Sequence, residues 1–411
     1  MNVLFISLGS YGDILPMVSI GKEFLAQNHQ VTLMTNENFK EIAISHGFAF
    51  LEVGTQKEYI STLKSINVKD SIFLGAKLLD FLVLNPIDPM LKKLQKTNKK
   101  DLLIISYPGN IAAKIFAEKH NINFVSVVFA PILLKSITNP PRINSYDFLN
   151  SLPIFIRRFL FFSFESILNL LLLKKVNKLR KSIGLDKISD FTSWIYSEQL
   201  ILALFDESFC AYLNDWPKQV QITGFPLASL NSTKSPTELR EFFQSKKDVI
   251  LFTQGTPNSH ISDFFSIASK ICKQLDIKGI FVTQFIEQIQ NLQSDHIIIC
   301  KSIDFKNTLA KIQGIVHHGG IGTSAQSLQA GIPQIIIPWG VDQYDNAKHL
   351  KKMGVSIEVS QGKSMQKNLQ KALKNILSNQ DIQAKAKKHS KQRNAFLGHK
   401  RAYEILIKHF T

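Results

Sequence analysis

Two histidines and a cluster of glycines lie together in the stretch HHGGIGT, residues 317–323. An apolar run precedes the cluster, and a helical stretch follows it and ends at Gly331. Glycines at such a junction permit a tight turn and a close approach of the backbone to a ligand. Free N–H groups at the start of the helix, with the Thr323 hydroxyl, suit an anion such as a phosphate. His318 can donate to the same anion, whereas His317 is interpreted as a packed residue at a buried strand end.

This glycine turn differs from the other common phosphate motifs. It lacks the G-x-G-x-x-G spacing of a dinucleotide site and the Gly-Lys-Ser/Thr ending of a P-loop. The two adjacent histidines lack the further ligands that a zinc site requires. A plain turn without a ligand is the alternative interpretation of the glycines.

Parallel strands are needed to position the turn, because ligands of open α/β sheets bind at the carboxyl ends of the strands. Apolar runs alternate with stretches of helical spacing, which is typical of a parallel sheet with crossover helices. In the first half, strands are predicted at 3–8, 30–35, 48–53, 101–106 and 123–129, with helices at 14–27, 37–46 and 110–119. In the second half, strands are predicted at 248–255, 277–283, 296–300, 314–318 and 333–339, with helices at 260–274 and 365–408.

The chain of 411 residues is long enough for two domains. We predict an α/β protein with an N-terminal domain at 1–222, a C-terminal domain at 223–385 and a helical segment at 386–411. A polar stretch with a proline, residues 231–238, is the expected linker.

Composition restricts the partners. The formal net charge of +17 favours an anionic partner: a phosphorylated ligand, an acidic membrane surface or a nucleic acid. The lysines are scattered and form no stripe with aromatic residues, which disfavours nucleic acid. Three widely spaced cysteines and an N-terminus without a basic, cleavable leader predict a cytoplasmic protein.

One segment, residues 151–181, is strongly apolar and aromatic, but charged residues such as Arg157, Arg158 and Glu165 interrupt it. Its uncharged runs fall short of the ~20 residues that span a bilayer. It is either a pair of buried helices or a basic-flanked apolar surface. In the second case, Phe161 and Phe162 contact a lipid-like acceptor, and the protein associates peripherally with the inner face of a membrane.

Longer stretches of the sequence resemble those of a known protein family. The stretch HHGGIGTSAQSLQAGIPQIIIPWGVDQYDNA, residues 317–347, resembles the nucleotide-sugar signature of family-1 and sterol/rhamnolipid-type glycosyltransferases. Further stretches in both halves are similar to that family, among them SLGSYGD at 7–13, ITGFP at 222–226 and ILFTQGT at 250–256. The resemblance implies a GT-B fold, in which two Rossmann-like, doubly wound domains face a cleft and a C-terminal helix crosses back to the first domain.

The resemblance also implies a donor site. His318 and Gly320 would face the α-phosphate, Thr323 the β-phosphate, and Asp342 with Gln343 the sugar hydroxyls. Gln326 stands where many relatives have a ribose-binding glutamate, and Phe305 either stacks on the base or belongs to the core. The full set of implied donor-binding residues is Gly12, Gly255, Thr256, Phe305, His318, Gly320, Gly322, Thr323, Gln326, Asp342 and Gln343.

Asp13 follows Gly12 where the first strand gives way to the first helix. In the resembling enzymes this position holds the base that takes the proton of the acceptor hydroxyl. The alternative is that Asp13 only caps a helix that begins near Ile14.

These observations predict an inverting glycosyltransferase with Asp13 and His318 as catalytic residues. A nucleoside-diphosphate hexose such as UDP-glucose is the expected co-substrate, with no metal and no further cofactor, and a hydrophobic or lipid-like hydroxyl compound is the expected acceptor. The alternatives are a nucleotide-sugar epimerase of the same fold and a non-catalytic binding protein for a nucleotide sugar or lipid.

Overall fold

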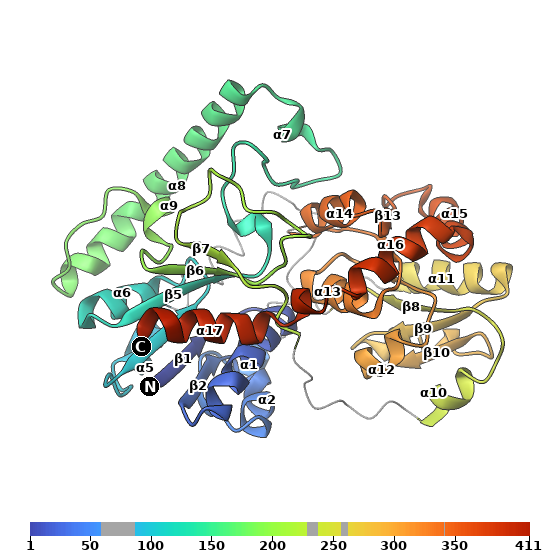
Figure 1. Cartoon of the computed structure of the whole chain (residues 1–411), viewed down its shortest axis with the longest axis horizontal. Coiled ribbons are helices and arrows are strands. Elements are labelled where there is room, and N and C mark those ends of the chain that lie inside the picture. Colours follow the sequence, from blue (N-terminus) through green and yellow to red (C-terminus); the bar gives the residue numbers. More distant parts are fainter. Residues whose placement is uncertain (59–86, 228–236, 256–261, 341) are drawn as a thin grey trace. The chain divides into compact units, whose positions relative to one another are not determined.

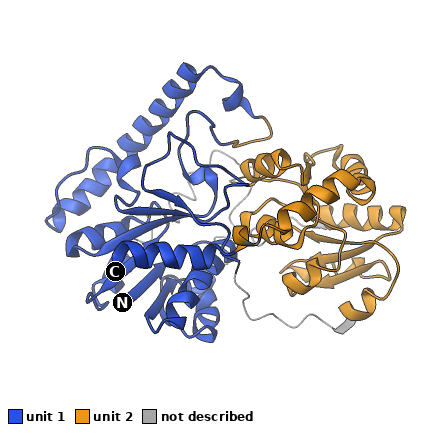
Figure 2. Cartoon of the chain, viewed as in Figure 1, with its two compact units in different colours: residues 1–141, 147–228, 397–411 blue, residues 142–146, 229–396 orange. Residues whose placement is uncertain are grey.

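A computed structural model divides the chain into two compact units, each built on its own sheet (Figures 1 and 2). The described residues are 1–58, 87–227, 237–255, 262–340 and 342–411. The first unit comprises residues 1–141, 147–228 and 397–411, and the second comprises residues 142–146 and 229–396. The first unit thus extends to residue 228 rather than 222, and the segment that returns to it begins at 397 rather than 386. Most of the expected linker, up to residue 236, lies outside the described residues.

The first unit contains a seven-stranded sheet in the order β3-β2-β1-β4-β5-β6-β7, with all neighbouring strands parallel. Buried apolar runs such as LLIIS in β4 explain why these strands lie inside a sheet covered on both faces. The strands are β1 (Asn2–Ile6), β2 (Gln30–Thr35), β3 (Ala49–Glu52), β4 (Leu102–Ser106), β5 (Asn123–Val128), β6 (Leu200–Ala203) and β7 (Val220–Ile222).

Helices cover this sheet, and the last helix of the chain is one of them. The helix α17 packs on α1, where the rings of Tyr403 and Phe24 lie 4.9 Å apart and His399 lies 3.6 Å from Glu23. The expected return of a C-terminal helix to the first domain is therefore confirmed. Among the described residues of this unit, the helices are α1 (Tyr11–Ala26), α2 (Lys40–Ser45), α5 (Ile87–Leu94), α6 (Ile111–His120), α7 (Phe148–Ser151), α8 (Ile154–Ser182), α9 (Phe191–Trp194) and α17 (Gly398–Phe410).

The second unit repeats the strand order of the first in a six-stranded parallel sheet, β10-β9-β8-β11-β12-β13. Its strands are β8 (Val249–Thr253), β9 (Lys278–Val282), β10 (Ile297–Cys300), β11 (Gly314–His317), β12 (Gln334–Ile336) and β13 (Ser356–Glu358). Its helices are α10 (Thr237–Phe242), α11 (Ser262–Leu275), α12 (Phe305–Leu309), α13 (Ile321–Ala330), α14 (Gln343–Lys352), α15 (Met365–Ser378) and α16 (Gln380–Ser390).

The core of the second unit has two halves, one on each face of the sheet. Alternate side chains of β8 point to opposite faces, as the pleat of a strand requires. Ile250 and Phe252 join a cluster with α11 and α15, while Val249 and Leu251 join a cluster with α10 and α12. Together the two sheets confirm the predicted pair of doubly wound α/β domains.

Two predictions at the level of elements need correction, and three strands were missed. The first helix begins at Tyr11 rather than near Ile14, because Ser10 caps it. The segment 151–181 is not a pair of buried helices: most of it forms the single helix α8, which runs to Ser182 and whose N-terminal half is exposed. The short strands β6, β7 and β13 were not predicted.

Candidate functional site

In both sheets, the candidate site residues lie on loops at the point where the strand order reverses, which is where doubly wound folds bind ligands. The strand order reverses direction between β1 and β4 in the first unit and between β8 and β11 in the second. Loops that leave the carboxyl ends of such strand pairs diverge and leave room for a ligand. Asp13 follows β1 in the first unit, and Gly255 and His318 follow β8 and β11 in the second. Asp13, Gly255 and His318 thus lie at the switch points of the two sheets.

His318 is held between two glycines. A Cβ atom on Gly255 would lie 2.5 Å from Cε1 of the His318 ring, and one on Gly320 would lie 2.5 Å from Nε2. Side chains at these positions would therefore displace the ring. Gly255 also has a φ of +73°, a backbone conformation that favours glycine.

His318 is uncharged and has one unpartnered nitrogen. Burial lowers the pKa of His318 to about 4, so the ring is neutral near pH 7. Its buried Nδ1 has no hydrogen-bond partner among the residues that the structure describes. A neutral imidazole offers one donor and one acceptor, so the ring can donate one hydrogen bond to a ligand without carrying a buried charge.

His317 has a structural role, as its position at a strand end indicated. Its Nδ1 accepts a hydrogen bond from the Gly319 N–H at 3.1 Å, and its Nε2 lies 2.9 Å from Oε1 of Gln334. The proton therefore lies on Nε2, which donates to Gln334. Burial, with a smaller contribution from His318, lowers the pKa of His317 to about 3, and both ring nitrogens are in use.

The helix α13 begins without a side-chain cap. Its N-cap residue is Gly320, whereas Ser10, Asn110 and Asp304 cap α1, α6 and α12 with their side chains. The N–H groups of the first turn, together with the helix dipole, favour an anion at this end. A Cβ on Gly322 would meet no other atom within 4 Å, so space for a ligand lies beside the first turn.

Other donor-site candidates lie along α13. Thr323 is the third residue of the helix and Gln326 lies one turn further on, and both are partly buried. Phe305, the first residue of α12, packs against the core cluster on one face of the sheet. Thr256 lies outside the described residues.

Asn346, which the sequence reasoning missed, links Asp342 to the glycine turn by hydrogen bonds. Nδ2 of Asn346 donates to the Gly319 carbonyl at 2.9 Å and to Oδ2 of Asp342 at 2.7 Å. The four-residue spacing from Asp342 to Asn346, one helical turn, was the available signal. Oε1 of Gln343 accepts from the Trp339 N–H at 2.7 Å, so its carbonyl holds a turn and its amide group remains for other contacts.

Asp13 is both a helix-capping residue and a carboxylate with an altered pKa. Its Oδ2 accepts from the backbone N–H of Ser10 at 2.7 Å and from the Ser10 hydroxyl at 3.2 Å. In turn, the Ser10 hydroxyl accepts from the N–H of Gly12 at 3.3 Å. Burial raises the pKa of Asp13 against the opposing effect of the Ser10 hydrogen bonds. Gly9 makes the arrangement possible, since a Cβ there would lie 2.0 Å from Oδ2.

Tyr107 is the second residue that sequence reasoning missed. It follows β4, the neighbour of β1, and burial together with the nearby Asp13 carboxylate raises its pKa. Two residues of different chain segments therefore meet at the switch point of the first sheet. Only the pairing of β1 with β4 brings them together, so no local pattern could have revealed Tyr107.

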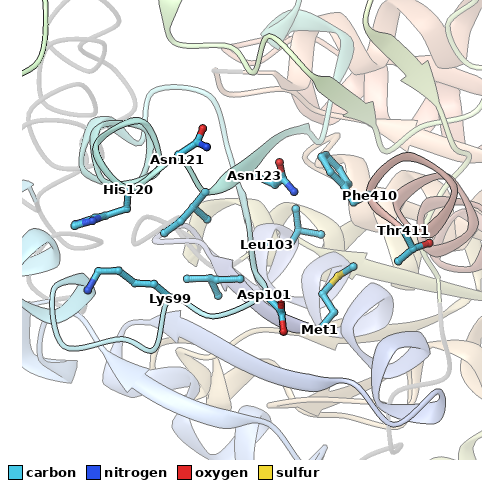
Figure 3. A pocket seen from close by; sticks show the side chains of 11 residues that line it. Met1, Lys99, Asp101, Leu103, His120, Asn121, Asn123, Phe410 and Thr411 are labelled. Atoms are coloured by element: carbon cyan, nitrogen blue, oxygen red, sulfur yellow. The ribbon is translucent and has the colours of Figure 1, made fainter.

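A surface depression of about 410 Å³ lies at the opposite end of the first sheet (Figure 3). Its lining includes Met1, Asp101 and Asn123, which lie at the amino ends of β1, β4 and β5. It is therefore separate from the switch point at Asp13.

Among the described residues, no group of three or more His, Cys, Asp and Glu side chains could hold a metal ion. Within the same ranges, none of the helices combines the length and apolar character needed to cross a membrane.

Comparison with known proteins adds independent findings. A family profile described as "Erythromycin biosynthesis protein CIII-like, C-terminal domain" matches residues 276–398. A sterol 3-beta-glucosyltransferase of Komagataella phaffii is 26% identical over 420 residues, covering 95% of this chain and 33% of that protein. A terpene cyclase-glycosyl transferase fusion protein of Humicola fuscoatra is 24% identical over 402 residues, covering 87% of this chain and 29% of that protein. The chain thus spans about a third of the length of these relatives.

Solved structures show the same fold. The glycosyltransferase of kitacinnamycin superposes with a TM-score of 0.75 at 16% identity, covering 100% of this chain and 99% of that one. The glycosyltransferase VinC in complex with dTDP superposes with a TM-score of 0.70 at 16% identity, again covering 100% and 99%. The two parallel-sheet units and these matches show that the chain has the GT-B fold. The matching profile and relatives show that the chain is similar to family-1 glycosyltransferases.

Proposed function

We propose that the chain transfers a hexose from a nucleoside-diphosphate sugar, UDP-glucose or a close analogue, to a hydroxyl group of a sterol-like acceptor. The anion site in the second unit carries this proposal. There the uncapped start of α13, the open space beside Gly322 and the unpartnered Nδ1 of His318 occur together. The similar proteins suggest the acceptor class, since several of them are sterol 3-beta-glucosyltransferases.

The donor diphosphate binds at the start of α13 in this proposal. The N–H groups of the first turn and the Thr323 hydroxyl hold the phosphates, and His318 donates one hydrogen bond as a neutral ring. Asp342, which Asn346 fixes at 2.7 Å, accepts from hydroxyl groups of the sugar, and the amide of Gln343 donates to them. A helix N-terminus and nearby donors stabilise the charge that develops on the leaving diphosphate.

Asp13 is the proposed base. Its carboxylate takes the proton of the acceptor hydroxyl while that oxygen forms a bond to the anomeric carbon. The bond from the anomeric carbon to the diphosphate oxygen breaks, and the nucleoside diphosphate leaves with the electron pair. A direct displacement of this kind inverts the anomeric configuration. The raised pKa of Asp13 makes it a stronger base than an ordinary carboxylate.

Incubation of the protein with labelled nucleotide sugars and a lipid extract tests the proposal. Label in the lipid phase supports transfer, with the sugar that gives the highest rate identifying the donor. Isomerised free nucleotide sugar supports an epimerase instead, and binding without any product supports a non-catalytic protein. Either of these two outcomes contradicts the proposed transfer.

A further inference from the structure

The N-terminal half of α8 exposes an unusual amount of apolar surface. In Figure 1 this half extends away from the sheet of its unit, toward α7. Phe155 and Phe159 are 69% and 68% exposed, and Leu170, just past the midpoint of the helix, is 81% exposed. The other exposed apolar residues of the helix are Ile154, Leu160, Phe162, Phe164, Ile167 and Leu171. Together they expose roughly 1,000 Å², more than the largest apolar patch of a typical monomer, so an interaction site is indicated.

The helix is anchored along its other side, so the exposure is not a consequence of a loose end. Its buried residues, Leu172, Val176 and Arg180, all lie in the C-terminal half. The N-terminal half is held by polar contacts instead. The Arg157 guanidinium donates to the carbonyls of Leu152 and Asn150 at 2.8 and 2.6 Å, and Glu165 pairs with Lys135 at 2.6 Å. These contacts fix which face of the helix points outward.

Cations follow the apolar surface along the same helix. The exposed residues of the C-terminal half include Lys174, Lys175, Lys178 and Lys181. Glu165 is the single acidic residue of α8, and Lys135 neutralises it. An apolar face beside unopposed lysines fits the boundary of an anionic bilayer, where rings enter the acyl region and cations meet headgroups. A second copy of the chain fits less well, because each copy carries a net charge of +17.

We propose that α8 docks the first unit on an anionic lipid bilayer. The rings of its N-terminal half enter the acyl boundary, and Lys174, Lys175, Lys178 and Lys181 bind the headgroups. The inference deepens the proposed function and rests on it in one respect: docking brings the protein to the surface where a lipid-like acceptor resides.

Flotation with vesicles tests the docking without reference to catalysis. The vesicles contain equal parts of phosphatidylcholine and phosphatidylserine, or phosphatidylcholine alone. The first variant carries Phe155→Ser, Phe159→Ser and Leu170→Ser. Its matched control carries Ile44→Ser, Leu133→Ser and Tyr212→Ser, three exposed apolar residues elsewhere in the same unit. We expect wild type and control to float with the anionic vesicles and the first variant to remain in the dense fraction.

A second pair of variants tests the cations. Lys174→Gln with Lys175→Gln should weaken binding to anionic vesicles by about 25-fold, at about fivefold for each lysine. Lys40→Gln with Lys218→Gln removes the same net charge from exposed positions on other elements and should change binding much less. Added salt should reduce the difference between the two pairs.

Several outcomes overturn the docking. One is wild-type protein that fails to float with anionic vesicles at low salt, and another is equal binding by both serine variants. Light scattering that shows a wild-type dimer, lost in the first variant while vesicle binding is unchanged, assigns the surface to a second copy. Transfer to a detergent-solubilised acceptor, which the first variant should retain, tests the proposed function separately. Flotation without any transfer leaves the docking intact and refutes the function.

Discussion

Replacement of Asp13 by asparagine separates catalysis from helix capping. Asparagine is of similar size, and its side-chain oxygen can accept the 2.7 Å hydrogen bond from the Ser10 N–H. It cannot accept a proton from an acceptor hydroxyl. The proposed base is therefore removed while the start of α1 is kept.

The expected effects on rate and stability have opposite directions. Loss of a general base lowers turnover by about 10²–10⁴, which is about 3–5 kcal/mol of barrier. Because burial raises the folded-state pKa of Asp13, the folded chain favours the protonated form. That contribution to stability is present below the unfolded pKa and is lost as pH rises through the folded one. Near pH 7 the uncharged Asp13→Asn variant should thus be at least as stable as wild type.

Ser10→Ala is the matched control. It removes the hydroxyl that accepts from the Gly12 N–H at 3.3 Å and leaves the carboxylate in place. Loss of an N-cap costs about 1 kcal/mol of unfolding free energy, and most of the turnover should remain. Thermal unfolding and initial rates of sugar transfer across pH 5–8 measure both effects. The wild-type rate should fall as pH drops through the raised pKa of Asp13.

Similar turnover and similar stability of the two variants would rule out Asp13 as the base. Asp13→Asn with near-normal turnover and a stability loss similar to that of Ser10→Ala would make Asp13 a capping residue only. Another base would then have to be sought, and Tyr107 would not be a candidate, because its raised pKa keeps the phenol protonated near pH 7.

Three further predictions concern the second unit and the anchor of α8. Gly322→Ala should raise the unfolding free energy by about 0.5–1 kcal/mol, since the added Cβ meets no atom within 4 Å. The same change should weaken nucleoside diphosphate binding in calorimetry, and unchanged affinity would argue against a ligand beside Gly322. Gly320→Ala forces the His318 ring to move and should therefore reduce turnover as much as His318→Ala, by about 10²–10³. Full activity in either variant would show that His318 is not part of the site. Arg180→Ala removes a buried ion pair with Glu118 and a cation–π contact with Trp194, so the unfolding free energy should fall by about 3 kcal/mol. A loss of nucleotide affinity at a temperature where the variant is folded would contradict this structural role of Arg180.

Strong local patterns made much of the fold predictable from the sequence. Continuous apolar runs such as VILFT, residues 249–253, indicate strands that are buried on both faces. The glycine turn at 319–322 could be placed because glycine is required where the backbone turns sharply and approaches other groups. At Gly319, for example, φ is +96°.

Other features depend on contacts between distant segments. The strands Leu200–Ala203 and Val220–Ile222 have four and three residues, and pairing with their neighbours rather than a local signal makes them strands. The proximity of Tyr107 to Asp13 likewise follows from strand pairing. The sequence could not predict which side of α8 is exposed either, because apolar residues surround the N-terminal half of the helix and define no single buried face.

The stereochemistry of the product tests the central claim most directly. Purified protein is incubated with UDP-glucose and a 3β-hydroxysterol, and proton NMR follows the anomeric signal of the product. Direct displacement from the α-linked donor predicts a β-glucoside, formed in equal amount with UDP and absent with Asp13→Asn. An α-glucoside, or UDP release without any glycoside, would contradict the account.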